Sequence, residues 1–212
     1  MPSAESGGVE NMWWSMAYGA ASFIFIDSET DFPGAPGDSY NLRPNGNFGD
    51  QLKWFEMALQ RANSTRATRP WIIVSGHRPV YSLDACNDAG VPVGAAADFQ
   101  KAFEHLLLQY KVDLYLAGHV HGSELSYPTR NNVPIQKHWN GAAAPTYAII
   151  GGAGNIEGLT NYTHDPQNVP WNAYVNGNDE ILCKLTVSPQ NLTLQYFISQ
   201  TAALDHQVVI TK

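Results

Sequence analysis

Apolar and polar residues follow two different periods along this chain, and the change between them divides it into two parts. In the first part, short apolar runs are separated by stretches whose apolar residues recur every three or four positions. Such runs predict buried strands, and such stretches predict helices that pack on them. After about residue 123, short runs that are continuous or alternating are separated by turn residues, which predicts an antiparallel meander.

The middle of the chain has the order helix, strand, helix, strand. The helix predicted over residues 51–62 carries an apolar stripe, with Asp50 as its N-cap. It leads to a strand over 71–74. A second helix is expected to open at Asp98 and to lead to a strand over 112–116. This order is typical of parallel α/β units.

Strands are also predicted on both sides of this central part. An aromatic-rich pair is expected over 12–16 and 22–26, with its turn at Tyr18-Gly19, followed by a loop rich in Pro, Gly and Asn over 31–49. The later strands are expected over 147–150, 181–187, 192–198 and 207–211. The pattern therefore predicts an α/β (α+β) fold in which parallel βα units precede an antiparallel meander.

The composition excludes some classes of protein. With 212 residues, of which 44% are hydrophobic and 15% charged, the chain is an ordinary globular protein long enough for one domain. A net charge of −7 argues against a nucleic-acid partner, which would attract a basic surface. No apolar run approaches the roughly 18–20 residues that cross a bilayer, so no membrane partner is expected. Cys86 and Cys183 fit either one disulfide or two buried thiols.

Two short histidine segments follow the strands of the central part. His77 comes after the apolar run 71–74, and His119 and His121 come after the run 112–116. Open α/β sheets place their sites at the carboxyl ends of their parallel strands. Three imidazoles at that edge, two of them separated by one residue, predict a metal centre in which they bind one ion or two adjacent ions.

Other polar residues near the strand ends have simpler interpretations. Asp27 ends an apolar strand in the manner of a carboxylate ligand, but shaping a turn is its favoured role. Gly37-Asp38-Ser39-Tyr40 carries an Asp/Tyr pair without a preceding strand, so we interpret it as a coincidence. Of the remaining histidines only His164, in a polar loop, is expected to approach a site; the others are His105, His138 and His206.

Several segments together resemble the C-terminal half of a purple acid phosphatase, a branch of the calcineurin-like metallophosphoesterases. The most specific are Gly76-His77-Arg78-Pro79-Val80-Tyr81, Ala117-Gly118-His119-Val120-His121 and Gly154-Asn155-Ile156-Glu157-Gly158. The strand pair with Trp14-Ser15-Met16-Ala17-Tyr18-Gly19 resembles fungal members most closely, and Leu204-Asp205-His206-Gln207-Val208-Val209 resembles the closing strand. The likeness spans roughly residues 11 to 211.

The resemblance implies the C-terminal half of an αββα sandwich. Residues 11–126 would form the C-terminal part of the metallophosphoesterase domain. Residues 145–211 would form the purple acid phosphatase C-terminal region of the same structural domain. In such enzymes two metal ions share one pocket and promote the hydrolysis of a phosphate monoester. The resemblance implies that His77 and His119 bind a divalent ion (zinc, manganese or iron) and that His121 binds iron.

The chain departs from the family pattern in its carboxylates. In the family, the Asp-x-Gly, Gly-Asp-x-x-Tyr and Gly-Asn-His-Asp/Glu motifs precede the part that this chain resembles. The chain does not carry the three motifs at that place. They supply the bridging aspartate, the iron-binding aspartate and tyrosine, and the divalent-site asparagine. About ten residues past His77, some members carry substrate-facing histidines where this chain has Cys86-Asn87-Asp88. A further departure is Gly122-Ser123-Glu124-Leu125, where a Tyr-Glu-Arg type of sequence is common.

The leading hypothesis is therefore an acid phosphatase-type metallophosphoesterase that acts on phosphate monoesters but is incomplete and weak or inactive as this chain alone. Its chemistry would need the N-terminal half of the site, from the same precursor or as a second chain. One alternative is a non-catalytic, diverged remnant with a binding role. Another is a mononuclear zinc hydrolase that uses the three histidines as its ligands.

Three sequons suggest a glycoprotein. They lie at Asn63, Asn161 and Asn191, and N-linked glycans are added to such sites in secreted proteins. The first residues lack the basic and apolar regions of a signal peptide. We therefore expect a secreted protein whose leader is not present in this sequence.

Overall fold

The computed structural model describes residues 1–36, 46–154 and 156–212. The segment Gly37-Asp38-Ser39-Tyr40 and Asn155 of the glycine-rich motif lie outside the described residues. The elements in chain order are β1 (Trp14–Tyr18), β2 (Ala21–Phe25), α1 (Gln51–Ser64), β3 (Trp71–Gly76), α2 (Gly94–Gln109), β4 (Leu114–Ala117), β5 (Ser123–Ser126), β6 (Thr129–Arg130), β7 (Val133–Pro134), β8 (Thr146–Ile150), the 3₁₀ turn η1 (Pro166–Asn168), β9 (Asn172–Asn176), β10 (Ile181–Val187), β11 (Asn191–Ile198) and β12 (Leu204–Thr211).

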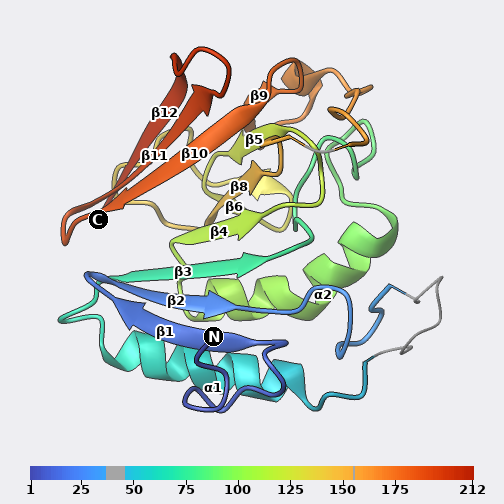
Figure 1. Ribbon diagram of the computed structural model, residues 1–212. Helices are drawn as coiled ribbons and strands as arrows, with labels where there is room; N and C mark the ends of the chain where they lie inside the picture. Colours follow the sequence, from blue (N-terminus) through green and yellow to red (C-terminus); the bar gives the residue numbers. More distant parts are fainter. Residues whose placement is uncertain (37–45, 155) are drawn as a thin grey trace.

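A seven-stranded sheet in the order β1-β2-β3-β4-β8-β5-β9 forms the centre of the described structure. Strands β2, β3, β4 and β8 pair in parallel, as the helix–strand alternation predicts, whereas β1, β5 and β9 run antiparallel to their neighbours. The α/β prediction is confirmed. Parallel strands joined by helices bring all their carboxyl ends to one edge of the sheet, which is the right-hand edge in Figure 1.

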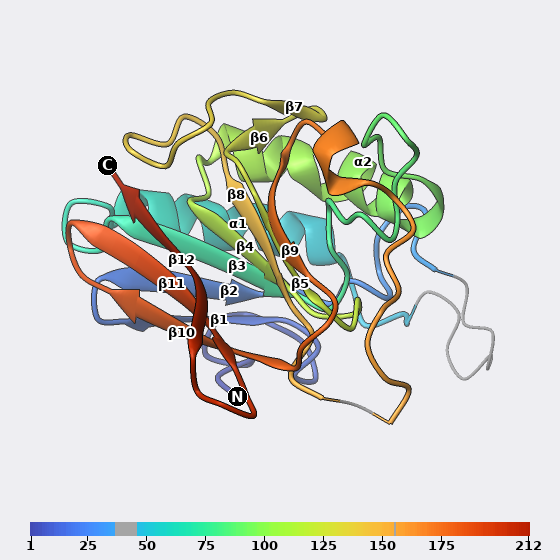
Figure 2. The same ribbon diagram turned by 90° about the horizontal axis from the view of Figure 1, so that it is seen from above.

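The two faces of this sheet are covered by different layers. Helices α1 and α2 pack on one face, where a cluster of rings (Phe32, Phe55, Phe99 and Phe103) fills the core. The antiparallel sheet β10-β11-β12 covers part of the other face, and its inward residues pack on Trp71 and Leu114. Figures 1 and 2 show this small sheet on the side away from the helices. The predicted meander is thus the third layer of the fold.

Strand β1 ends the seven-stranded sheet, and its outer residues are open to solvent. The side chains of Met16 and Tyr18 are 37% and 71% exposed. Trp14 stacks on Phe25 of β2, with ring centroids 3.9 Å apart. These side chains share the face that β10–β12 cover further along the sheet, because side chains of one strand alternate between faces. An aromatic strip is therefore left at this edge of the sheet.

Helix α1 matches its prediction and α2 does not. The Asp50 carboxylate accepts a hydrogen bond of 3.0 Å from the Lys53 backbone N–H, as expected of an N-cap. Helix α2 begins at Gly94 rather than at Asp98, and its N-terminus has no side-chain cap. The preceding alanines are strong helix formers, and Ala96 is buried, so packing extends the helix past the aspartate that a sequence pattern favours as its start.

Between residues 123 and 176 the sequence predicts the strand that becomes β8, but not β5, β6, β7 or β9. All four residues of β5 are buried although three of them are polar. Strand β9 has only three apolar residues, between two asparagines, and none of its residues is fully buried. Both strands are held by pairing on neighbours far away in sequence, and that pairing leaves no periodic signal. No helix among the described residues is long and apolar enough to cross a membrane.

Candidate metal centre

The fold brings His77 and His119 together. His77 follows the last residue of β3, and His119 lies two residues after the end of β4, the parallel neighbour of β3. The Gly118 N–H donates a 3.0 Å hydrogen bond to the His77 carbonyl, so one turn is tied to the other. A Cβ added at Gly76 would lie 2.7 Å from the Tyr115 hydroxyl, so this glycine is needed for the strand end to pack. The predicted meeting of the two turns at one sheet edge is confirmed for this pair.

The distance between the two rings suits a shared metal ion. The Nε2 atom of His77 and the Nδ1 atom of His119 lie 3.1 Å apart, with the rings inclined at 76°. Two imidazole nitrogens bound to one tetrahedral zinc at about 2.0–2.1 Å are separated by about 3.3–3.4 Å, so a small opening of the pair would admit the ion. Both histidines are exposed, so this pair faces an open side of the molecule. The residues therefore fit part of the coordination of one ion.

His119 is held in a form that favours ligation. Partial burial lowers its pKa, and the positive charge of Arg78 and the neighbouring His77 lower it further. A neutral imidazole keeps a lone pair for a metal. The backbone of His119 has a φ of 64°, in the left-handed region that costs a non-glycine residue energy. Such strain is typical of functional positions, where the surrounding structure maintains it.

His121 lies apart from this pair. Its Nε2 atom is 3.7 Å from a carboxylate oxygen of Glu157, and its backbone exchanges hydrogen bonds with Thr160. In the part of the chain that the structure describes, no three His, Cys, Asp or Glu side chains come together as a group that could hold an ion. The three-histidine zinc site considered from the sequence is therefore not assembled among these residues.

Arg78 and Glu29 border the histidine pair, and sequence reasoning did not single them out. The Nε and Nη2 atoms of Arg78 donate to Glu29 Oε2 at 3.0 and 2.9 Å, and its Nη1 atom is 3.1 Å from His119 Nε2. Glu29 belongs to the acidic segment after β2. Asp27 at the start of that segment accepts bonds from the Glu29 N–H and the Thr30 hydroxyl, which is the turn-shaping role that the sequence favours.

The other histidines lie away from this pair or belong to other contacts. His105 and His138 are exposed, and His206 stacks on Tyr174 at 4.3 Å between ring centroids. His164 lies 3.5 Å from the Asp88 carboxylate. It therefore approaches the 86–88 segment, in the loop that follows the His77 turn. It also lines a hollow together with Leu83 and Thr160, which lie beside the two histidine turns.

The cysteines and the sequons have clear positions. Cys86 is buried in the core beneath the helices, whereas Cys183 packs on the opposite side of the large sheet, and both are free thiols. The disulfide alternative is therefore wrong, because the sheet separates the two sulfur atoms. Asn63, Asn161 and Asn191 are all exposed.

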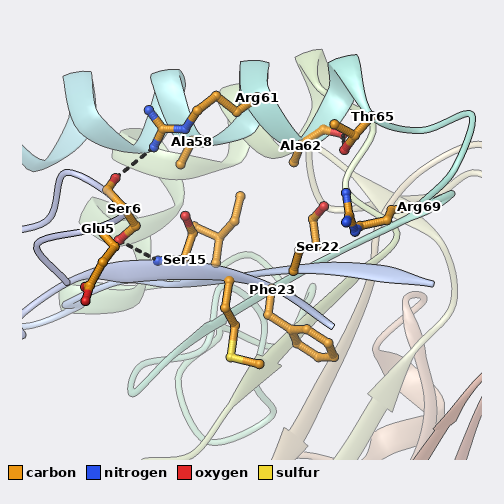
Figure 3. Close-up of a pocket in the computed structure, with 13 residues that line it drawn as sticks. Glu5, Ser6, Ser15, Ser22, Phe23, Ala58, Arg61, Ala62, Thr65 and Arg69 are labelled. Atoms are coloured by element: carbon orange, nitrogen blue, oxygen red, sulfur yellow. Dashed lines mark hydrogen bonds between the residues drawn. The ribbon is translucent and has the colours of Figure 1, made fainter. Parts of the chain in front are cut away.

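A separate hollow lies between α1 and the β1–β2 pair. It has a volume of about 270 Å³ and shares no lining residue with the histidine turns. Figure 3 shows Arg61 directed to the Ser6 carbonyl at one end, with Arg69 beside Ser22 and Thr65 at the other. Its two arginines give it the character of an anion-binding hollow rather than of a metal site, because its lining includes a single carboxylate and no histidine.

Both the α/β part of this chain and its C-terminal part are similar in sequence to known protein families. Residues 13–123 match the family described as Calcineurin-like phosphoesterase, and residues 144–208 match the family described as Iron/zinc purple acid phosphatase-like protein C. Acid phosphatase A of Cryphonectria parasitica is 37% identical, over 89% of this chain and 36% of its own length. Acid phosphatase type 7 of Homo sapiens is 34% identical, over 79% of this chain and 38% of its own length. The chain thus spans little more than a third of these relatives.

A solved structure shares the fold. The purple acid phosphatase PPD1 from yellow lupin (Lupinus luteus) seeds aligns with a TM-score of 0.71 at 24% identity, over 96% of this chain and 34% of its own. That likeness concerns the arrangement of the strands and helices. The family matches concern the sequence, and one of them covers both histidine turns. The chain therefore belongs to the calcineurin-like phosphoesterase family, in its purple acid phosphatase branch.

Proposed function

We propose that this chain contributes His77, His119 and His121 to a dinuclear metal centre that hydrolyses phosphate monoesters. The observation that carries the proposal is the 3.1 Å separation of His77 Nε2 and His119 Nδ1, which suits two ligands of one ion. His121, which belongs to the same strand-end turn but not to the pair, would bind the second ion. Several relatives are acid phosphatases, which supports the reaction class.

The remaining ligands would come from polypeptide outside these 212 residues. Two cations in one pocket need carboxylates to balance their charge. Near the histidine pair, Glu29 is bound to Arg78, Asp27 is bound to its own turn, and Asp84 is exposed, and the described residues do not gather three ligating groups there. The open side of the pair and the aromatic strip on β1 and β2 are surfaces on which such a segment would pack. We infer that the chain alone binds metal weakly and has little or no activity.

The chain's own residues would act mainly by positioning charge. When bound, two such ions would stabilise the charge on the phosphoryl group as Lewis acids and lower the pKa of bound water. The family implies one iron ion together with zinc, manganese or a second iron. Burial and Arg78 lower the pKa of His119, which favours the neutral imidazole that can ligate. Glu29 fixes the Arg78 guanidinium beside the pair, where its positive charge favours a phosphate dianion.

Metal binding by the purified chain tests the ligand assignment. Titration with Zn²⁺ by calorimetry should give a weak site that His77→Ala and His119→Ala each abolish, while His105→Ala, an exposed histidine on α2, leaves it unchanged. Equal Zn²⁺ affinity in the wild type and the two site variants would contradict the assignment.

Hydrolysis of p-nitrophenyl phosphate tests the incompleteness. The chain should show no turnover above a His119→Ala/His121→Ala control, and activity should appear only when a segment with the missing carboxylate motifs is supplied. A turnover by the 212-residue chain clearly above that control would refute this part of the proposal. An Arg69→Gln variant controls for binding of the phosphate group in the separate hollow of Figure 3.

A non-catalytic module is the second candidate, favoured by the lack of a third ligand beside the histidine pair among the described residues. The coding sequence upstream of Met1 would distinguish such a module from a metallophosphoesterase. An intact reading frame there with the carboxylate motifs would argue against the module.

We further propose that the protein is secreted and carries N-linked glycans. The exposure of all three sequon asparagines supports this.

A further inference from the structure

The side chain of Glu124 is a buried carboxylate that lies between the two histidine turns. It is 2% exposed and comes three residues after His121, at the second position of β5. Its main chain is fixed in the sheet between β8 and β9, and the Tyr196 hydroxyl donates to its carbonyl at 3.1 Å. Glu124 is therefore a rigid point of the fold from which the side chain reaches into a neighbouring segment.

That segment is the loop that follows His77. The Ser82 hydroxyl donates to Glu124 Oε1 at 2.8 Å, and the Leu83 N–H donates to Oε2 at 2.9 Å. The Ser82 hydroxyl oxygen in turn accepts a hydrogen bond of 3.0 Å from the Asp84 N–H. This contact leaves the hydroxyl proton of Ser82 directed to the Glu124 carboxylate. Ser82 and Leu83 are fully buried, so their polar groups need a partner inside the protein. The carboxylate therefore holds this loop at two points.

The same carboxylate lies beside the segment that supports His121. Tyr162 borders Glu124, and its hydroxyl packs so close to Gly122 that a Cβ there would lie 2.4 Å from it. Two residues earlier, Thr160 exchanges backbone and side-chain hydrogen bonds with His121. One buried group thus contacts the loop after His77 and the residues that pack against the His121 turn.

Packing alone does not account for a carboxylate in this position. No cation pairs with Glu124 among the described residues, and the charge that faces it, on Asp84, has the same sign. Burial raises its pKa to about 7, which measures how unfavourable the ionised form is there. An apolar side chain of similar size would avoid that cost. However, an apolar side chain would not accept the hydrogen bonds that the Ser82 hydroxyl and the Leu83 N–H donate to the Glu124 carboxylate.

We propose that Glu124 is a positioning residue that fixes the spacing between the His77 turn and the His121 turn. It does so by joining the loop after β3 to β5, with no contact to a metal or a substrate. The consequence for metal binding rests on the proposed function; the rigidity of the two turns does not.

Hydrogen exchange of the metal-free chain tests the positioning directly. In Glu124→Leu, the Leu83 amide loses its acceptor and should exchange about tenfold faster or more, together with amides of the 77–84 and 118–122 turns. Glu124→Gln keeps an acceptor and should restore wild-type exchange within about threefold. The matched control is Glu104→Leu, because Glu104 is also buried and accepts from Tyr81 but does not contact the His121 side. It should leave the 118–122 turn unchanged.

A Zn²⁺ titration of the same variants tests the consequence for the site. The affinity should fall about tenfold or more in Glu124→Leu and return in Glu124→Gln. If the wild type binds no Zn²⁺, the proposed function fails while the exchange result still decides the positioning role. If Glu124→Leu does not fold, Ser82→Ala removes one of the two contacts and should raise exchange in both turns by about threefold. Faster exchange spread evenly over β10–β12, or an equal effect of Glu104→Leu on both turns, would overturn the proposal.

Discussion

The raised pKa of Glu124 makes the stability of the folded chain depend on pH in a way that one substitution removes. Burial raises this pKa from its usual 4.5 to about 7, and the hydrogen bonds from Ser82 and Leu83, which are neutral donors, offset only part of that rise. Between these values the folded protein holds a proton that the unfolded chain releases. The group's contribution to the free energy of unfolding therefore falls as pH rises from 4.5 to 7, and the full penalty applies above 7.

The magnitude follows from the difference between the two pKa values. One pKa unit corresponds to about 1.4 kcal/mol, so the difference between the two pKa values lowers the free energy of unfolding by about 3 kcal/mol at pH 8. At pH 5, where the folded carboxyl group is protonated, it lowers this free energy by about 1 kcal/mol. Glu124→Gln cannot ionise and carries no such penalty. Any hydrogen bond that the amide makes less well costs the same at every pH. The stability of the variant relative to the wild type should therefore rise by about 2 kcal/mol between pH 5 and pH 8.

Urea unfolding of both proteins at pH 5, 6, 7 and 8 measures this difference, because all other titrating groups are shared and cancel. With a urea m-value of about 2 kcal/mol/M, the midpoint difference should grow by about 1 M across the range. A difference that is constant with pH, or that shrinks as pH rises, would refute the reasoning. It would mean that Glu124 ionises in the folded chain as readily as in water.

Three further expectations follow from the packing, the thiols and the surface. Phe103→Ala should lower the free energy of unfolding by about 3–5 kcal/mol in urea, because Phe103 is fully buried among Phe32, Phe55 and Phe99; a loss below about 1 kcal/mol would show that the core closes over the gap. Burial raises the thiol pKa of Cys86 to about 11 and of Cys183 to about 12, so both thiols should react with iodoacetamide far faster in urea than in the folded chain. Because both are free, reductant should not change the melting temperature. Equal labelling rates, or a melting temperature lowered by reductant, would contradict this. Expression through a secretory pathway should add glycans that Asn191→Gln reduces by one, as seen by mass before and after deglycosylation, whereas an unchanged mass would show the sequon to be unused.

The central elements could be predicted because their signal is local. Helix α1 and strands β3 and β4 combine an apolar period with flanking turn residues, and the two histidine turns follow from their places after such strands. The start of α2 could not be placed in this way. Asp98 has the residue type of a cap, but burial of Ala96 outweighs that preference.

Much of the site's surroundings carries no local signal. Glu29 and Arg78 are 49 residues apart, and their pairing depends on β2 and β3 being neighbours in the sheet. Glu124 lies in a strand of mostly polar residues, which a hydrophobicity pattern does not mark as buried. Its importance is visible only when Ser82 and Leu83 are seen to share its two oxygens.

The sequence by itself determined the parallel α/β centre, the meander that follows it and the edge at which the histidines lie, because strand period and helix period are written in neighbouring residues. It also contained the residues that mark the family. The tertiary structure decided which histidines meet: His77 and His119 do, and His121 is turned to Glu157. It also separated Cys86 from Cys183 and placed a carboxylate between the two turns. These outcomes depend on which distant strands pair, and pairing is set by the packing of the whole sheet rather than by any one segment.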